Sequence, residues 1–132
     1  NATLTIGRLL NFFPQNRQPQ IRRDLSLHLK AVVSQLLLPS IKPDIQRVPA
    51  CEIMFVNSLI SRLIVEEKDE KIIRAIKAGK EEGMIDFENS LVSLVNNGFI
   101  EKETALRFAE NPQSVEMKLR GIFLSEEGGI VN

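Results

Sequence analysis

The sequence is poor in the residues that build redox and metal sites. It has one cysteine, Cys51, and one histidine, His28, among 132 residues. A lone cysteine cannot form an internal disulfide or supply the ligand set of a structural zinc site. A lone histidine gives neither a two-histidine metal site nor a catalytic triad. We therefore expect no metal ligands and no catalytic residues here, with Cys51 a small core residue and His28 a partly buried helix residue.

The sequence also lacks an excess of charge and a long apolar run. Seventeen basic residues balance seventeen acidic ones, so composition gives no reason to expect a nucleic-acid partner. No apolar stretch reaches the roughly 18 residues that a membrane span needs. The first residue is Asn1 rather than methionine, and no signal-peptide pattern follows it. We infer a fragment, or a numbering that starts inside a longer chain.

What is present is the composition of an ordinary globular domain with helical periodicity at its start. Apolar residues make up 43% and charged residues 26%, enough for one domain with a core. Apolar side chains recur at helical spacing at Ile6, Leu9, Leu10 and Phe13. They predict a helix over residues 2 to 12, with Thr3 or Thr5 as its cap. Pro14 ends it, and residues 14 to 20 are predicted to form a polar loop.

Residues 21 to 31 fit two structures. Leu25, Leu27 and Leu29 alternate with polar residues, which favours a strand, while Ile21, Leu25 and Leu29 also form a helical stripe. We predict a helix, mainly on the family resemblance given below. Residues 32 to 38 and 50 to 56 are predicted strands, paired as an antiparallel hairpin with a long connection.

From Ser58 onward the pattern predicts only helices. Their expected starts are Ser58, Asp69, Asp86, Glu101 and Asn111. Glycines at 79 and 98 mark two of the expected ends. Val115, Leu119 and Ile122 carry the apolar face of the last helix, and the residues from Ser125 are predicted to be a frayed tail.

Three local patterns suggest chemistry but have simpler interpretations. Ala78-Gly79-Lys80 resembles the end of a phosphate-binding loop, but Arg74 and Glu81 stand where that loop needs glycine and a hydroxyl residue. A helix C-terminus with a favourable lysine explains it better. The mixed charges of residues 66 to 71 indicate a solvated corner between helices. Arg8 and the Arg22-Arg23 pair are typical partners of surface carboxylates, with contact to a neighbour's phosphate as the alternative.

Glu52 is the exception among the charged residues, because it lies within a predicted strand. A carboxylate at that position needs solvent or a cation, and Arg47 is a plausible partner. We predict a structural ion pair between Arg47 and Glu52 rather than a catalytic role. The local chemistry thus yields no active site. Either the chain is a binding or structural domain, or its site is completed elsewhere.

From Thr5 to about Pro112, the chain resembles the part of the PilT-type motor ATPases that follows their histidine-containing box. The matching residues are spread along the chain: Ile6, Arg8, Phe13, Pro14, Ile21, Arg22, Leu25, Leu29, Val33, Ser34, Gln35, Leu37, Arg47, Val48, Ala50, Glu52, Ile53, Met54, Gly83, Met84, Ser90, Leu91, Gly98 and Ile100. None is a strong motif, but their order and spacing make the resemblance specific.

The resemblance implies an α/β fragment of a type II/IV secretion ATPase. Residues 1–57 would be the C-terminal portion of a RecA-like core with an antiparallel strand pair, 58–124 a helical bundle, and 125–132 a flexible tail. The family's phosphate-binding loop, acidic boxes and histidine box lie N-terminal to the matched region. ATP and Mg would therefore bind in the parent protein, and this chain alone is expected to be inactive.

The resemblance also implies a cytoplasmic motor at the inner membrane that powers type IV pilus retraction and twitching motility. The implied partners are the parent's ATP-binding region, further copies in a hexameric ring, and the inner-membrane platform protein of the pilus. Within this assembly the chain would transmit ATP-driven motion and supply subunit contacts. The alternative is a non-catalytic scaffold or regulatory domain derived from such an ATPase.

One family motif departs from its pattern in this chain. PilT-type proteins carry a retraction-linked helix reading Ala-Ile-Arg-Asn-Leu-Ile-Arg-Glu, which aligns with residues 59 to 66. The matching residues, our candidates for subunit contact, are Ile60, Leu63, Ile64 and Glu66. Ser61 and Val65 replace the two arginines. The apolar face survives and core packing is its alternative role, whereas the altered charged face favours a divergent PilT-like paralogue.

The hairpin region gives a second comparison within the family. Related assembly and export ATPases carry a four-cysteine zinc insert near it, which a chain with one cysteine cannot hold. The retraction branch is therefore closer. The glycine-rich turn of that branch is replaced here by residues 40 to 46, which contain Pro43 and form a stiffer connection.

Overall fold

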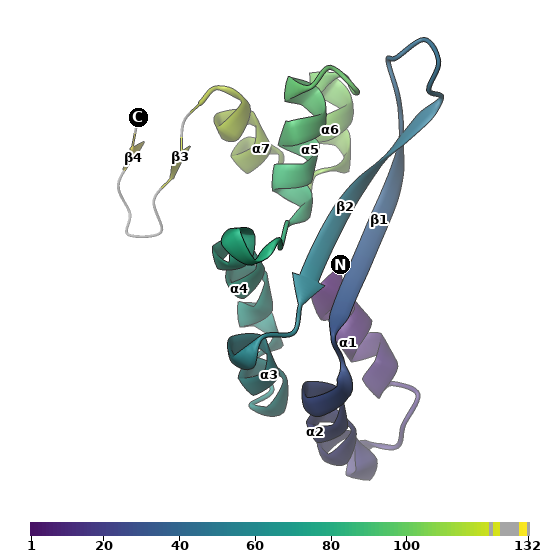
Figure 1. The fold of residues 1–132 in the computed structure, drawn as a ribbon, viewed down its shortest axis with the longest axis vertical. Coiled ribbons are helices and arrows are strands. Elements are labelled where there is room, and N and C mark those ends of the chain that lie inside the picture. The colour runs from purple at the N-terminus through teal and green to yellow at the C-terminus, as the bar shows by residue number, and fades with distance from the viewer. Residues whose placement is uncertain (122, 125–129, 132) are drawn as a thin grey trace. The chain divides into compact units, whose positions relative to one another are not determined.

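The computed structural model describes residues 1–121, 123–124 and 130–131 of the chain, and side chains up to residue 121 (Figure 1). By its internal contacts the chain divides into two compact units. Unit 1 comprises Asn1–Ser34 and Cys51–Asp86, and unit 2 comprises Gln35–Ala50 and Phe87–Asn132. The division of the family-like core from the bundle at residue 57 stays a prediction.

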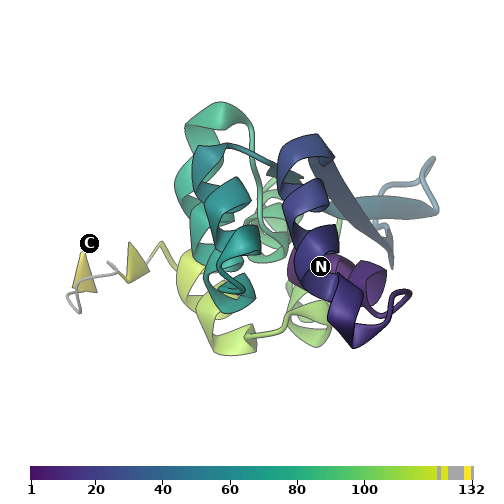
Figure 2. The same cartoon turned by 90° about the horizontal axis from the view of Figure 1, so that it is seen from below.

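Unit 1 is built from four helices among the described residues. They are α1 (Ala2–Leu10), α2 (Gln18–His28), α3 (Ser58–Val65) and α4 (Ile72–Ala78), and α2 packs along α3 (Figure 2). Short 3₁₀ turns occupy Gln15–Arg17, Asp69–Lys71 and Gly79–Glu82. The predicted helix at 21 to 31 is confirmed as a helix, but it begins earlier, within the expected loop, and ends at His28, three residues before the predicted end. Pro19 is tolerated because the first helical turn needs no amide donor there.

The strands β1 (Ala31–Pro39) and β2 (Arg47–Phe55) form the predicted antiparallel pair. β1 is longer than expected by one residue at each end, whereas β2 begins three residues earlier and ends one residue earlier than expected. The N-terminal part of β1 and the C-terminal part of β2 belong to unit 1. There Ile53 also forms an antiparallel bridge with Ile85, through N–H···O bonds of 2.8 and 3.1 Å. The prediction of helices alone after Ser58 was therefore wrong at Ile85, because residue spacing does not reveal an isolated bridge.

The core of unit 1 collects one apolar stripe from each helix, as helical periodicity requires. Its buried members are Ala2, Ile6, Leu10, Val32, Met54, Ile60, Leu63, Ile64, Ile72, Ala75, Ile76 and Met84. Ile21, Leu25 and Leu29 of α2 pack against it from one side. The helical stripe of Ile21, Leu25 and Leu29 is thus the face that packs against the core. Leu27, which belongs only to the alternating pattern that favoured a strand, is 68% exposed.

Three predicted helix caps were wrong by one to four residues. Asn1, not Thr3 or Thr5, caps α1, and its Oδ1 accepts a 2.9 Å bond from the amide of Leu4. Asn57, not Ser58, caps α3 by accepting from Ile60 N at 3.0 Å. Asparagine caps as well as serine or threonine, so residue type alone does not choose between neighbours. Asp69 makes no capping bond; its carboxylate binds an arginine instead.

Unit 2 joins the tip of the hairpin to α5 (Phe87–Asn96), α6 (Lys102–Phe108) and α7 (Pro112–Leu119). Its buried core is Leu38, Ala50, Leu91, Ile100, Ala105 and Val115. The connection after β1 is fixed to the α5–α6 turn: Ile41 N donates to Phe99 O at 2.9 Å, and Lys42 Nζ lies 5.3 Å from the Phe99 ring centroid. The cap at Asn111 is confirmed, with a 3.1 Å bond from Ser114 N.

Two short strands, β3 (Phe123–Leu124) and β4 (Ile130–Val131), pair antiparallel beyond α7, which again departs from the expectation of helices only. Ile122 and most of the predicted frayed tail, residues 125 to 129 and 132, lie outside the described residues. Across the described part of the chain, none of the helices has both the length and the apolar character needed for a membrane span.

An ion-pair cluster between α6 and α7 predicts an acid sensitivity. Glu116 Oε1 lies 3.0 Å from Lys102 Nζ and 2.9 Å from Arg120 Nη2, and the bond from Lys102 lowers the pKa of Glu116. A carboxylate with a lowered folded-state pKa stabilises the fold above its unfolded pKa, and the contribution disappears as pH falls through the folded pKa. We expect Glu116→Gln to lower stability at pH 7, and we expect this loss to shrink as the pH falls through the lowered folded-state pKa of Glu116.

Urea unfolding of both proteins at pH 7 and at a series of lower pH values measures this difference. Glu103→Gln is the control, because its carboxylate is exposed and outside the Lys102–Glu116–Arg120 cluster. A change in stability for Glu116→Gln that stays the same across the pH series would contradict the assignment.

Candidate functional site

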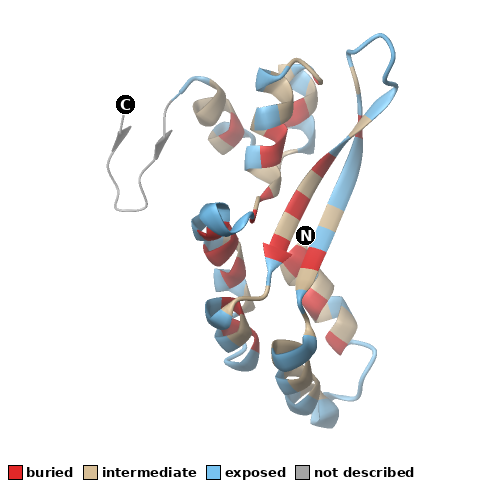
Figure 3. Cartoon of the chain, viewed as in Figure 1, coloured by how far each residue is buried: buried red, intermediate tan, exposed pale blue. Residues whose placement is uncertain are grey.

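The stretch that resembles the family motif forms helix α3 and its C-cap, Glu66. Ile60 and Ile64 are fully buried and Leu63 is 6% exposed, so these three candidates lie in the core of unit 1. Figure 3 colours the buried positions along the helices red. Glu66 is exposed. Within this chain, the three apolar side chains therefore have the role given as the alternative to subunit contact, which is packing in the core. A role of any of the four in contact with another subunit stays a prediction.

The two residues that replace the motif arginines lie in different surroundings. Ser61 Oγ donates a 2.9 Å bond to the carbonyl of Ser26 on α2, so a short hydroxyl side chain fills the place where α2 and α3 meet. Val65 is 45% exposed and presents an aliphatic surface where the motif has a guanidinium. The solvent-exposed residues of the aligned stretch 59 to 66 are thus Leu59, Arg62, Val65 and Glu66.

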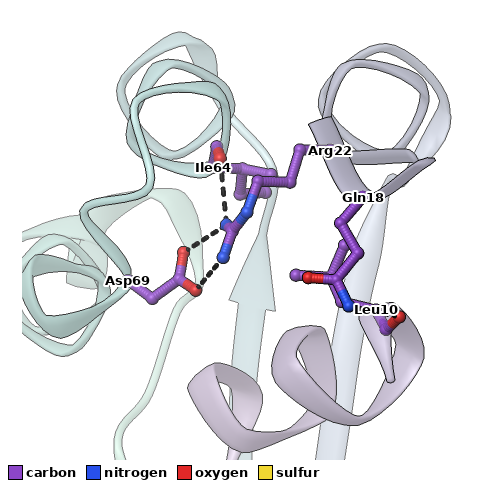
Figure 4. Close-up of polar contacts among 5 residues, drawn as sticks. All are labelled: Leu10, Gln18, Arg22, Ile64 and Asp69. Carbon is purple, nitrogen blue, oxygen red and sulfur yellow. Dashed lines mark hydrogen bonds and ion pairs between the residues drawn. The ribbon is translucent and has the colours of Figure 1, made fainter. Parts of the chain in front are cut away.

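Arg22 of α2 connects three segments of unit 1. Its two terminal nitrogens bind the Asp69 carboxylate at 2.8 Å each, and Nη1 also donates to the carbonyl of Ile64 at 3.1 Å (Figure 4). The hydrogen bonds that Arg22 donates to Asp69 raise the pKa of Arg22. The Ile64 carbonyl also accepts from Glu67 N at 3.4 Å, and it lies in the last turn of α3, where a cation is favourable. Arg22 therefore fixes the end of α3 and the turn that follows it.

Helix α2 also makes hydrogen bonds at the C-terminal end of α1. Gln18 Nε2 donates to the carbonyls of Leu10 and Phe13 at 3.3 Å each, and Figure 4 shows Gln18 beside Leu10. The Leu10 carbonyl also accepts from the amide of Phe13 at 3.0 Å, in the turn before Pro14. α2 thus binds α1 through Gln18 and α3 through Arg22. The sequence had suggested a surface carboxylate for Arg22, but Asp69 lies 47 residues away and nothing in the local pattern pointed to it.

The charge run at residues 66 to 71 is an exposed corner, as predicted, except for Asp69. Lys68 Nζ lies 2.6 Å from Glu66 Oε2, and this bond lowers the pKa of Glu66. Glu67 adopts a left-handed conformation, with φ 59°, unusual for a residue that is not glycine. The Arg22–Asp69 bond lies just beyond this tight turn and helps to hold it.

Glu52 is 2% exposed, and its Oε1 accepts a 2.7 Å bond from the amide of Ala2, the first residue of α1. Buried polar groups in proteins are normally hydrogen-bonded, and the amide of Ala2 supplies one such bond to this carboxylate. Arg47 is exposed and belongs to unit 2, whereas Glu52 belongs to unit 1. The ion pair between them stays a prediction. The link to Ala2 was missed, since helical spacing cannot show what lies at a helix start 50 residues away.

The remaining sequence candidates have structural surroundings. Gly79 caps the end of α4, and a Cβ there would lie 2.7 Å from Met84 Cε. The glycine thus admits a buried methionine, which agrees with the helix-end interpretation of Ala78-Gly79-Lys80. Cys51 is half-buried. His28 is exposed rather than partly buried, at the last turn of α2, where its Nδ1 lies 2.9 Å from Asp24 O.

Known proteins were compared with the chain in sequence and in structure. A twitching motility protein of Neisseria gonorrhoeae is 36% identical over 86% of this chain, and the type IV pilus ATPase PilU of Pseudomonas aeruginosa is 32% identical over 91%. The crystal structure of the pilus retraction motor PilT with bound ADP superimposes with a TM-score of 0.74 at 32% identity, over 86% of the chain. The chain is homologous to the C-terminal part of PilT-like ATPases.

The similarity extends over most of this chain but over only part of the length of each similar protein. The chain spans about a third of their length, 30% and 31% for the two proteins and 31% for the PilT structure. The ATPase DotB of Legionella pneumophila shares the fold, with a TM-score of 0.62 at 15% identity. No family model matches the chain. The chain thus shares the fold of the C-terminal part of the PilT structure, as the resemblance implied.

Proposed function

We propose that this chain is the mechanical portion of a PilT-like hexameric ATPase that powers type IV pilus retraction. Its role is to transmit ATP-driven motion and to supply contacts between subunits. The observation that carries the proposal is the match of 86% of the chain to the pilus retraction motor, at a TM-score of 0.74. The bonds of α2 to both α1 and α3 support it, because force passes best through helices that move as one body.

ATP and Mg bind, on this proposal, in the part of the parent protein that the chain does not match. The one stretch that resembles a phosphate loop is used for packing, with Gly79 against Met84. The partners are the parent's ATP-binding region, identical subunits in the ring, and the inner-membrane platform protein of the pilus. The location is the cytoplasm, at the inner membrane.

A second candidate is a non-catalytic scaffold or regulator derived from a secretion ATPase. The altered face of α3 favours it, because Ser61 is engaged with α2 and Val65 offers no charge to a neighbour. A protein of this kind keeps the packing of unit 1 but not the charged contact of the retraction motif.

Extending the reading frame upstream of Asn1 and purifying its complete product separates the two candidates. If the chain is part of a motor, we expect the upstream sequence to encode a phosphate-binding loop and a histidine box. We also expect the complete product to form a hexamer in native mass spectrometry and to hydrolyse ATP. A start codon close to Asn1, with no ATP turnover by the product, would leave the scaffold as the explanation.

A further inference from the structure

The contact between β2 and the start of α1 is unusual because it uses a buried carboxylate on a strand whose other residues after Arg47 are apolar. Glu52 lies between Cys51 and Ile53, and Glu52 and Ala2 are 2% and 0% exposed. The bond from Ala2 N to Glu52 Oε1 measures 2.7 Å, within the range of charge-assisted bonds. A carboxylate is favoured there because the first turn of a helix presents unpaired N–H groups and the positive end of the dipole.

Both ends of this contact are held by other bonds. Asn1 Oδ1 accepts from Leu4 N, which fixes the first turn of α1, and Ile6 anchors the next turn in the core. On the strand, Ile53 is bound to Ile85 through two backbone hydrogen bonds. Glu52 therefore connects a rigid strand to a rigid helix start, and its carboxylate sets the direction in which the backbone enters α1.

We infer that Glu52 is a positioning residue for the ATP-hydrolysing part of the parent protein. The inference rests on the proposed function. The chain matches the C-terminal part of the PilT structure. On the proposed function, the nucleotide-binding part of the parent protein therefore connects to this region at the entry to α1. The carboxylate of Glu52 holds that entry in register with β2. It acts through the backbone of Ala2 and does not touch nucleotide.

The test uses the complete product of the reading frame that contains this chain. We expect Glu52→Ala to lower kcat for ATP at least about tenfold, with the KM for ATP changed less than about twofold. Glu52→Gln keeps an oxygen that can accept from Ala2 N, so we expect it to retain kcat within about threefold. Val115→Ala is the control for loss of stability, because it removes buried volume from the core of unit 2, whereas Glu52 and Ala2 belong to unit 1.

Assays at a temperature well below the melting point of every variant separate positioning from stability. A Glu52→Ala protein with parental kcat, or a Val115→Ala protein with the same loss of kcat, would overturn the inference while leaving the proposed function intact. A parent protein without ATP turnover would overturn the proposed function, and the inference with it.

Discussion

Replacing Ile60 by alanine lowers the free energy of unfolding of the chain by about 3 kcal/mol, the middle of the range for buried isoleucine. Ile60 is fully buried in the core of unit 1, on the face of α3 that meets its other buried side chains. Its removal loses apolar burial and leaves a cavity that the capped, anchored α3 cannot close by shifting. Urea unfolding monitored by circular dichroism measures the change.

Leu59→Ala is the matched control for this prediction. It removes the same number of carbon atoms from the adjacent position of the same helix, but Leu59 is 40% exposed. We expect a loss of less than about 1 kcal/mol, because less apolar surface is uncovered. Equal losses for the two variants would contradict the placement of Ile60 in the core. A ring-contact role alone would instead reduce assembly while leaving the stability of the chain unchanged.

The second large effect is expected at Arg22. Arg22→Ala removes a bidentate ion pair with Asp69 and a bond to the carbonyl of Ile64, which also accepts from Glu67 N at 3.4 Å. Bonds to charged groups are worth about 1.5–3 kcal/mol, and partial exposure of this pair reduces its value, so we expect a loss of about 2 kcal/mol. Lysine is not an adequate substitute, because a single ammonium cannot reproduce the planar fork.

Arg23→Ala provides the control for charge and helix propensity. Arg23 follows Arg22 on α2, is exposed, and donates only to Gln20 on its own helix at 2.9 Å. Its loss should change the stability by less than about 0.5 kcal/mol. In a double-mutant cycle, Arg22→Ala and Asp69→Ala should be strongly non-additive, with a coupling of about 1 kcal/mol or more. Additive losses would contradict a direct pair.

Periodic apolar spacing predicted the helices and strands of the described chain well, because burial of one face imposes that spacing. Ile72 and Ile76 of α4 are buried as their positions required. The caps were less predictable, since Asn1 and Asn57 compete with neighbours of equal capping ability. The bridge between Ile53 and Ile85 joins residues whose pairing depends on the assembled unit rather than on local pattern.

In the candidate site, too, features that depend on local sequence were predicted, whereas contacts between residues far apart in the sequence were not. The sequence identified α3 as the motif helix and anticipated packing as the alternative role of Ile60. It did not identify Asp69 as the partner of Arg22, or Ala2 as a partner of Glu52, because these contacts span 47 and 50 residues. A buried carboxylate inside an apolar strand was the available signal, and it indicated the need for a partner without identifying one.

The claim at the centre of this account is that the chain does mechanical work for a nucleotide site located elsewhere in the parent protein. Isothermal titration calorimetry of the purified 132-residue chain with Mg-ATP tests it most directly. The account predicts no saturable binding at nucleotide concentrations up to about 1 mM, an affinity limit of about −4 kcal/mol. Stoichiometric binding in the micromolar range would contradict it.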